Sequence, residues 1–176
     1  MNYNRVVCFD LEMCCWNQNG IGTTGEIIEI GLAEIDVVQK RIVKRAQYYV
    51  MPERDEVSEF CTELTGISQR KLDKQARPLA EVLRSVVKNF GGRNKLYACW
   101  GRDELILQQE CLEKSLDCPI EECLNMVSIF ALKQRMKDCR FGQRQAMELL
   151  DISWEGRQHS AYVDAYNLAK LALNVL

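Results

Sequence analysis

The chain has 176 residues, of which 47% are hydrophobic and 27% charged, a composition typical of a globular protein with a substantial core. Its net charge of −2 argues against a protein that holds nucleic acid mainly through a global basic field, but not against a nuclease that uses acidic residues to bind cations. No apolar run is long enough to cross a bilayer and the first residues lack a secretory pattern, so we expect one domain, 1–176, in the cytoplasm, with no membrane partner.

The first third of the chain predicts three strands. Residues 5–11 are dense in β-forming apolar residues, residues 27–35 alternate in part, and residues 41–50 form a third run that ends before Pro52. A polar, glycine-bearing stretch, 17–25, predicts a loop between the first two strands. Antiparallel hairpin pairing is the simplest arrangement of the three.

After Pro52, helical patterns dominate. Apolar residues recur every three or four positions from Pro78 onwards, which predicts an amphipathic helix that stops at Gly91-Gly92. The order of all the elements predicts an α/β domain with a mixed sheet flanked by helices. The elements expected in this part are helices at 58–64, 68–75, 79–90, 103–116, 129–137, 142–150 and 161–175, with strands at 96–100 and 123–128.

Two carboxylates stand at the end of the first predicted strand. Asp10 and Glu12 are alternate residues, so they project from one face of the strand while Leu11 points the other way. Neighbouring carboxylates repel one another unless a cation neutralises them, and hard cations such as Mg²⁺ take oxygen ligands. Taken alone, the pair is equally compatible with a solvated strand end that carries two surface acids.

A further carboxylate and the single histidine lie near the other end of the chain. Asp164 falls on the apolar face of its predicted helix, where an acid is costly unless it is paired or bound to metal. His159 precedes that helix and could deprotonate an attacking water as a general base. The alternatives are an acid favoured by the helix dipole and a structural histidine. Asp103, which follows the strand ending at Trp100, could equally cap the next helix.

Together these residues resemble the three motifs of the DEDD superfamily of 3′→5′ exonucleases, in its histidine-bearing branch. The motifs are Phe9-Asp10-Leu11-Glu12, Trp100-Gly101-Arg102-Asp103 and His159-xxxx-Asp164, which span nearly the whole chain. Other stretches look like the Eri-type subgroup, which includes the histone-mRNA 3′ exonucleases. They are Glu26-Ile-Ile-Glu-Ile-Gly31, Phe60-Cys-Thr-Glu-Leu-Thr-Gly-Ile67, Cys14-Cys15-Trp16 and Gly156-Arg157-x-His159.

The resemblance implies a ribonuclease-H-like fold and removal of nucleoside 5′-monophosphates, one at a time, from 3′ ends of single-stranded nucleic acid. RNA is the favoured substrate, and DNA is a further candidate. The resemblance also implies two divalent cations, Mg²⁺ or Mn²⁺, with Asp10, Glu12 and Asp164 as ligands of one and Asp10 bridging to the other. Asp103 would assist through water, and His159 would activate the hydrolytic water.

Other positions match residues that, in this family, embrace the terminal base and ribose. They are Met13 and the segment Leu64-Thr65-Gly66-Ile67, where apolar side chains can stack on any base. Trp16 and Trp100 are candidate stacking platforms. Core packing is the alternative for Leu64, Ile67 and both tryptophans. Candidates for phosphate contacts, or ordinary surface charges, are Arg102, Arg140, Arg144 and Arg157.

One departure from the subgroup concerns the interval after Trp100-Gly101, which is one residue shorter than usual. The acid of that motif is therefore Asp103 or Glu104, with Asp103 preferred. Two other functions stay open: an exonuclease of the same class specific for DNA, and a catalytically silent domain that binds RNA or a protein.

The nine cysteines are odd in number and scattered, which predicts free thiols in a reducing compartment. Cys111, Cys118 and Cys123 form a loose cluster, and a cysteine-rich zinc module is a third alternative. Because the spacing is not Cys-x-x-Cys and no histidine is near, we expect no structural zinc.

Overall fold

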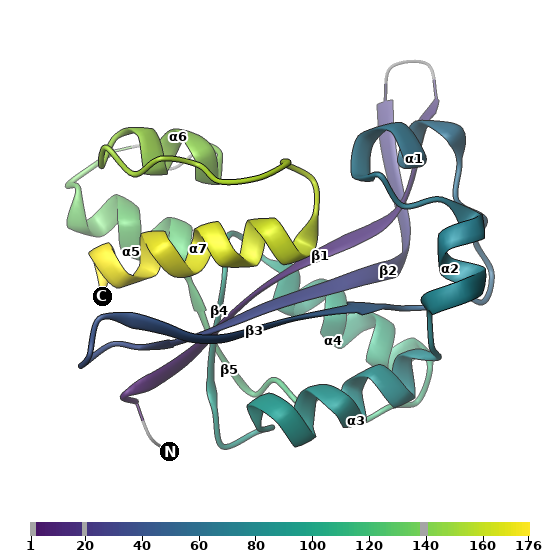
Figure 1. Cartoon of the computed structure of the whole chain (residues 1–176), viewed down its shortest axis with the longest axis horizontal. Coiled ribbons are helices and arrows are strands. Elements are labelled where there is room, and N and C mark those ends of the chain that lie inside the picture. The colour runs from purple at the N-terminus through teal and green to yellow at the C-terminus, as the bar shows by residue number, and fades with distance from the viewer. Residues whose placement is uncertain (1–2, 19–20, 138–140) are drawn as a thin grey trace.

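A mixed sheet of five strands forms the centre of the molecule, with helices on both of its faces (Figure 1). The structure, a computed structural model, describes residues 3–18, 21–137 and 141–176. The strand order is β3-β2-β1-β4-β5. The strands are β1 (Arg5–Gln18), β2 (Ile21–Asp36), β3 (Arg41–Tyr49), β4 (Leu96–Cys99) and β5 (Glu122–Asn125).

The first three strands pair antiparallel, as the sequence predicts, whereas β4 runs parallel to β1 and β5 runs parallel to β4. The predicted α/β class with a mixed, helix-flanked sheet is therefore confirmed. Ala98 of β4 lies opposite Cys8 of β1, so the chain leaves β4 close to Asp10. This register brings the second acidic motif to the first.

The alternation of β1 divides the core into two layers. Val7 and Phe9 face one layer with α3 and α4, and Val6 and Cys8 face the other with α5, α6 and α7. The short helices α1 and α2 pack against the far part of the β1–β2 hairpin (Figure 1). The helices are α1 (Glu59–Thr65), α2 (Gln69–Gln75), α3 (Leu79–Phe90), α4 (Asp103–Glu113), α5 (Met126–Lys133), α6 (Gln143–Glu148) and α7 (Ala161–Val175).

The first hairpin is longer than its composition predicts. Residues 17–25 were expected to form a loop, but β1 continues to Gln18 and β2 begins at Ile21, with Trp16 opposite Thr23. Backbone pairing outweighs the polar composition here, and the adjoining part of the hairpin packs Cys14, Cys15 and Ile28 against α1 and α2. The loop prediction was therefore wrong at both of its ends.

The other differences are at element boundaries. Residues 123–128 predict a strand, but β5 stops at Asn125, whose side chain accepts a hydrogen bond from the Val127 amide (3.1 Å) and caps α5. The helix predicted at 129–137 therefore starts and ends earlier in the chain. Helix α4 is likewise shorter than the predicted helix 103–116.

The eight described cysteines are free thiols, as the sequence predicts. Most of them are buried in the core, and Cys118 and Cys123 are half-buried. The ninth, Cys139, lies outside the described residues. None of the helices that the structure describes has the length and apolarity needed to cross a membrane.

Candidate active site

Three carboxylates from opposite ends of the chain meet beside the middle of the sheet. Asp10 and Glu12 project from β1 toward α7, and Asp164 lies in the first turn of α7. One oxygen atom of each carboxylate lies within 4.8 Å of the others. Glu12 is 9% exposed and Asp164 8% exposed, so water screens their mutual repulsion poorly. The group could therefore hold a divalent cation.

A buried glutamate on β2, which the motif comparison left without a role, fixes the start of α7. Glu29 is 1% exposed, and its carboxylate accepts hydrogen bonds from the backbone amides of Ala161 (3.1 Å) and Tyr162 (3.3 Å). It does the work of a helix cap from a neighbouring strand, since the side chain of Ser160 makes no capping hydrogen bond. The sequence signal was an acid between isoleucines in a buried strand.

Close backbone packing brings α7 onto the sheet beside this cap. A side chain at Gly31 would place its Cβ 1.9 Å from the carbonyl oxygen of Ala161. Only glycine permits this approach, which sets the height of Asp164 above β1. The Glu26-to-Gly31 stretch therefore serves the geometry of the site.

Burial raises the pKa of every carboxyl in the group, and the charges of neighbouring acids raise it further. The pKa of Asp10 lies well above its ordinary range, because the group is buried and because Asp103 and Asp164 add negative charge. The pKa of Glu12 rises to about 8, and that of Asp164 to about 7, each mainly through burial. A bound cation would reverse these shifts, because it stabilises the charged carboxylates.

Asp103 belongs electrostatically to the same group. It begins α4, and after burial its charge is the strongest influence that raises the pKa of Asp10. Burial, together with the charge of Glu104, raises the pKa of Asp103 itself to about 7, while a hydrogen bond from the Leu11 backbone lowers it. Asp103 therefore contacts β1 close to the first acidic motif.

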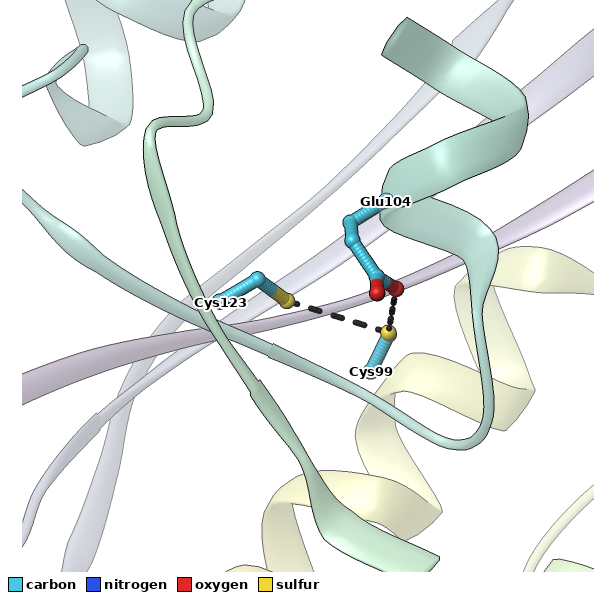
Figure 2. A group of neighbouring side chains, drawn as sticks. All are labelled: Cys99, Glu104 and Cys123. Carbon is cyan, nitrogen blue, oxygen red and sulfur yellow. Dashed lines mark hydrogen bonds between the residues drawn. The ribbon is translucent and has the colours of Figure 1, made fainter. Parts of the chain in front are cut away.

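Glu104 points elsewhere (Figure 2). Its Oε2 accepts a hydrogen bond from the thiol of Cys99 at 3.0 Å, on the side of β5 and Cys123. Of the two acids that the shortened interval leaves open, the geometry favours Asp103 for the carboxylate group.

His159 lies at the open side of the site. Its residue is exposed, and its backbone amide donates a hydrogen bond to Oδ2 of Asp164 at 3.1 Å. Its φ of 61° is in the left-handed region, which only a few per cent of non-glycine residues adopt. Gly156, three residues earlier, also has a positive φ of 85°. The tight turn thus holds His159 next to Asp164 while its imidazole stays accessible.

The residues expected to embrace a terminal nucleotide differ in their accessibility. Ile67 is 1% exposed, and the hydroxyl of Thr65 donates to the carbonyl of Cys61 (2.8 Å) and accepts from the amide of Ile67 (3.1 Å). This packing favours the core alternative for Ile67. Met13 and Leu64 are half-buried, so part of each side chain faces solvent.

Both candidate stacking tryptophans take part in apolar clusters. The ring of Trp100 packs against Phe130 and Phe141, with centroid separations of 6.0 and 6.2 Å. Trp16 packs against the cluster between the hairpin, α1 and α2. Each tryptophan is half-buried, so core packing accounts for a large part of both rings.

One of the candidate phosphate-binding arginines has a structural contact instead. Arg157 donates hydrogen bonds to the carbonyl oxygens of Glu63 (2.6 Å) and Leu64 (3.2 Å). It therefore ties the turn before His159 to the end of α1. The remaining candidates are Arg102, which is exposed, Arg144, which pairs with Glu148, and Arg140, which lies outside the described residues.

One further observation favours a divalent cation at the carboxylate group. Oδ1 of Asp164 is buried, and no donor within the described ranges reaches it. A buried carboxylate oxygen without a partner is costly, and hard cations are bound by such oxygens. The donor set, carboxylates only, fits Mg²⁺ or Mn²⁺.

Solved structures share this architecture. The nuclease domain of 3′hExo, a DEDDh family member bound to rAMP, matches with a TM-score of 0.84 and 24% sequence identity, covering 98% of this chain and 91% of that one. The sheet and its helices therefore have the ribonuclease-H-like exonuclease fold that the sequence predicts.

The RNase T exonuclease family model matches residues 7–172, and the chain belongs to that family. Its relatives include ERI1 exoribonuclease 2 of Danio rerio, 31% identical, and 3′-5′ exoribonuclease 1 of Rattus norvegicus, 26% identical. Each alignment covers 99% of this chain, but only 35% of the first relative and 53% of the second. The predicted exonuclease family is thus confirmed, its relatives include Eri-type exoribonucleases, and the chain spans about half or less of the length of these relatives.

Proposed function

We propose that the protein is a metal-dependent 3′→5′ exonuclease that hydrolyses single-stranded RNA from its 3′ end and releases nucleoside 5′-monophosphates. The observation that carries the proposal is the convergence of Asp10, Glu12 and Asp164, with a buried oxygen of Asp164 left without a donor. Family membership supplies the reaction class. Residues 1–176 would form one exonuclease domain, and the free cysteines suit a reducing, cytoplasmic setting.

Two divalent cations, Mg²⁺ or Mn²⁺, would occupy the site. Asp10, Glu12 and Asp164 are the proposed ligands of one, and Asp10 and Asp103 would hold the other, Asp103 through water. When bound, the cations supply Lewis-acid stabilisation of the negative charge that builds up on the scissile phosphate. Four clustered carboxylates account for the need for two cations, since a single divalent ion leaves half of their charge uncompensated.

His159 is the proposed general base. Its exposed imidazole would accept the proton of the attacking water, while its backbone hydrogen bond to Asp164 keeps it beside the carboxylates. Arg157 would preserve this position by tying the same turn to α1. Met13 and Leu64 would contact the terminal nucleotide with their exposed parts, with Thr65, Ile67 and Trp100 shaping the surface beneath.

The relatives favour RNA over DNA as the substrate. Both are named exoribonucleases, and the related nuclease domain of 3′hExo is bound to rAMP, a ribonucleotide. An exonuclease for DNA is the second candidate. A protein distinguishes RNA from DNA by its contacts to the 2′-hydroxyl, so those contacts decide between the two candidates.

The substrate preference is tested with RNA and DNA oligonucleotides of the same sequence, each labelled at the 5′ end. With Mg²⁺ or Mn²⁺ we expect a ladder of shortened RNA and nucleoside 5′-monophosphates as products, and no reaction with chelator. Laddering of DNA alone would contradict the RNA preference. A non-catalytic binding domain predicts intact oligonucleotides of both kinds.

A further inference from the structure

A second cluster of potential ligands lies where β4, β5 and the start of α4 meet (Figure 2). Cys99 ends β4, Cys123 lies on β5, and Glu104 is in the first turn of α4. The two sulfur atoms are 3.7 Å apart, and Oε2 of Glu104 is 3.0 Å from Sγ of Cys99. The three potential ligand atoms all lie within 4.8 Å of one another, and the proposed hydrolysis uses none of them.

These separations are close to those of a tetrahedral zinc site. With a Zn–S distance of ~2.3 Å, two thiolates on one ion lie ~3.8 Å apart, which matches the observed sulfur separation. A sulfur and a carboxylate oxygen on the same ion lie ~3.6 Å apart, so Glu104 would withdraw by ~0.6 Å from its present hydrogen bond. Glu104 is half-buried and stands in the first turn of its helix, where a shift of this size is small.

The cluster also differs in chemistry from the carboxylate group. Two sulfur ligands select thiophilic cations such as Zn²⁺, whereas an all-oxygen group suits Mg²⁺ or Mn²⁺. Cys99 is fully buried and fixed by the sheet, and Cys123 and Glu104 are half-buried, which leaves a path from solvent. The sequence could not reveal this pairing, because the partners of Cys123 lie 24 and 19 residues away, on other elements.

We propose that Cys99, Cys123 and Glu104 form a binding site for one Zn²⁺ ion, with the fourth position open to water. On binding, the two thiols lose their protons to the solvent, and the hydrogen bond from Cys99 to Glu104 is replaced by coordination. This site differs from the cluster of Cys111, Cys118 and Cys123 that the sequence suggests.

Zinc binding at this place would slow RNA hydrolysis, a consequence that rests on the proposed function. Glu104 directly follows Asp103, and both stand in the first turn of α4. The ~0.6 Å withdrawal of Glu104 from Cys99 on coordination would be shared by the first turn of α4 and would therefore shift the carboxylate of Asp103 relative to Asp10. The site would therefore be an inhibitory zinc site beside the proposed Mg²⁺ site.

Binding is tested on the full chain with Cd²⁺ as a probe, in excess Mg²⁺, by ultraviolet thiolate-to-metal absorption. We expect one Cd²⁺ per chain, displaced by Zn²⁺. Cys123→Ser should abolish the absorption, and Glu104→Gln should weaken binding about tenfold. Cys118→Ser, another half-buried thiol, and Asp10→Ala, in the carboxylate group, should bind as wild type does. Equal absorption in wild type and Cys123→Ser, or none in wild type, would overturn the site.

A second measurement needs no variant. Zn²⁺ should protect Cys123 of the wild-type chain from alkylation and leave Cys118 reactive, as mapped by peptide mass. Equal alkylation of Cys123 with and without Zn²⁺ overturns the proposal.

Inhibition by Zn²⁺ is tested separately, by the rate of RNA shortening at saturating Mg²⁺. Zn²⁺ should lower the rate of wild type and leave that of Cys123→Ser unchanged. Equal loss in both proteins would contradict the coupling to Asp103. A chain that shows the Cd²⁺ absorption but never shortens RNA would contradict the proposed function and not the zinc site.

Discussion

Asp103 and Glu104 are adjacent in the chain but have different surroundings. The charge of Asp103 acts on Asp10, whereas Glu104 accepts a hydrogen bond from Cys99. Asp103→Asn should therefore lower RNA hydrolysis roughly 100-fold, because a carboxylate that holds a cation through water is lost. Glu104→Gln should keep the rate within about threefold of wild type in zinc-free buffer. Steady-state kinetics with labelled RNA measures both rates. A large loss in Glu104→Gln with a nearly unchanged rate in Asp103→Asn would make Glu104 the acid of the motif.

The role of His159 can be separated from that of the metal ligands. His159→Asn removes the base while keeping a residue type that tolerates the positive φ at this position. We expect kcat to fall about 100-fold or more, with the Mg²⁺ concentration at half-maximal rate unchanged, because the imidazole is exposed beside the carboxylate group. A rise in the required Mg²⁺ with unchanged kcat would instead make His159 part of the cation site.

At the scale of elements, the site depends on the contact between α7 and β2. Gly31→Ala places a methyl group 1.9 Å from the carbonyl oxygen of Ala161, so we expect a loss of about 1–3 kcal/mol in the free energy of unfolding. Gly92→Ala is the matched control, since its new methyl group would meet only the Val87 side chain at 3.7 Å. Urea unfolding of both variants tests this, and equal stability would mean that α7 can move away from the sheet at little cost.

The sequence predicts these elements unevenly, for physical reasons. The period of α3 and α7 shows in the sequence because each buries one apolar face. The extension of β1 to Gln18 and the start of β2 at Ile21 do not show in the sequence, because these strand ends are held by pairing between the strands. Boundaries such as that at Asn125 depend on a single capping hydrogen bond.

The candidate site was predictable where a motif names the residue. Asp164 carries the signal as an acid on an apolar helix face, and Asp10 and Glu12 carry it as alternate acids of one strand within a recognisable motif. Glu29 supports them through a fold contact with α7, 132 residues away in the sequence, which no local pattern contains. The proximity of Cys99 and Cys123 could not be predicted from the sequence for the same reason.

At the scale of the whole molecule, the clustered acids link stability to pH and to cations. Glu12 and Asp164 have pKa values raised to about 8 and about 7 in the folded chain, above their values of about 4 when unfolded. As pH rises, these groups lose their protons at a lower pH in the unfolded chain than in the folded chain. Their contribution to the free energy of unfolding is therefore largest below about pH 4 and falls as pH rises through 7 and 8.

Thermal unfolding with and without Mg²⁺ checks this linkage. In chelator, the melting temperature should fall between pH 6 and pH 8.5. The corresponding loss in the free energy of unfolding should be on the order of 2 kcal/mol, shared between the coupled carboxyl groups. Mg²⁺ should raise the melting temperature most at pH 8.5, and Asp164→Asn should reduce the fall in chelator. A melting temperature that rises with pH in chelator would show that the carboxylates are not crowded as described.

The central claim, hydrolysis at this carboxylate group, is tested most directly by one comparison. Wild type and Asp10→Ala are incubated with 5′-labelled single-stranded RNA in Mg²⁺, and the lengths of the labelled products are followed over time. Wild type should produce a ladder that shortens from the 3′ end, and Asp10→Ala, folded by circular dichroism, should leave the RNA intact. Intact RNA with wild type in both Mg²⁺ and Mn²⁺, or equal shortening by the two proteins, would contradict the account.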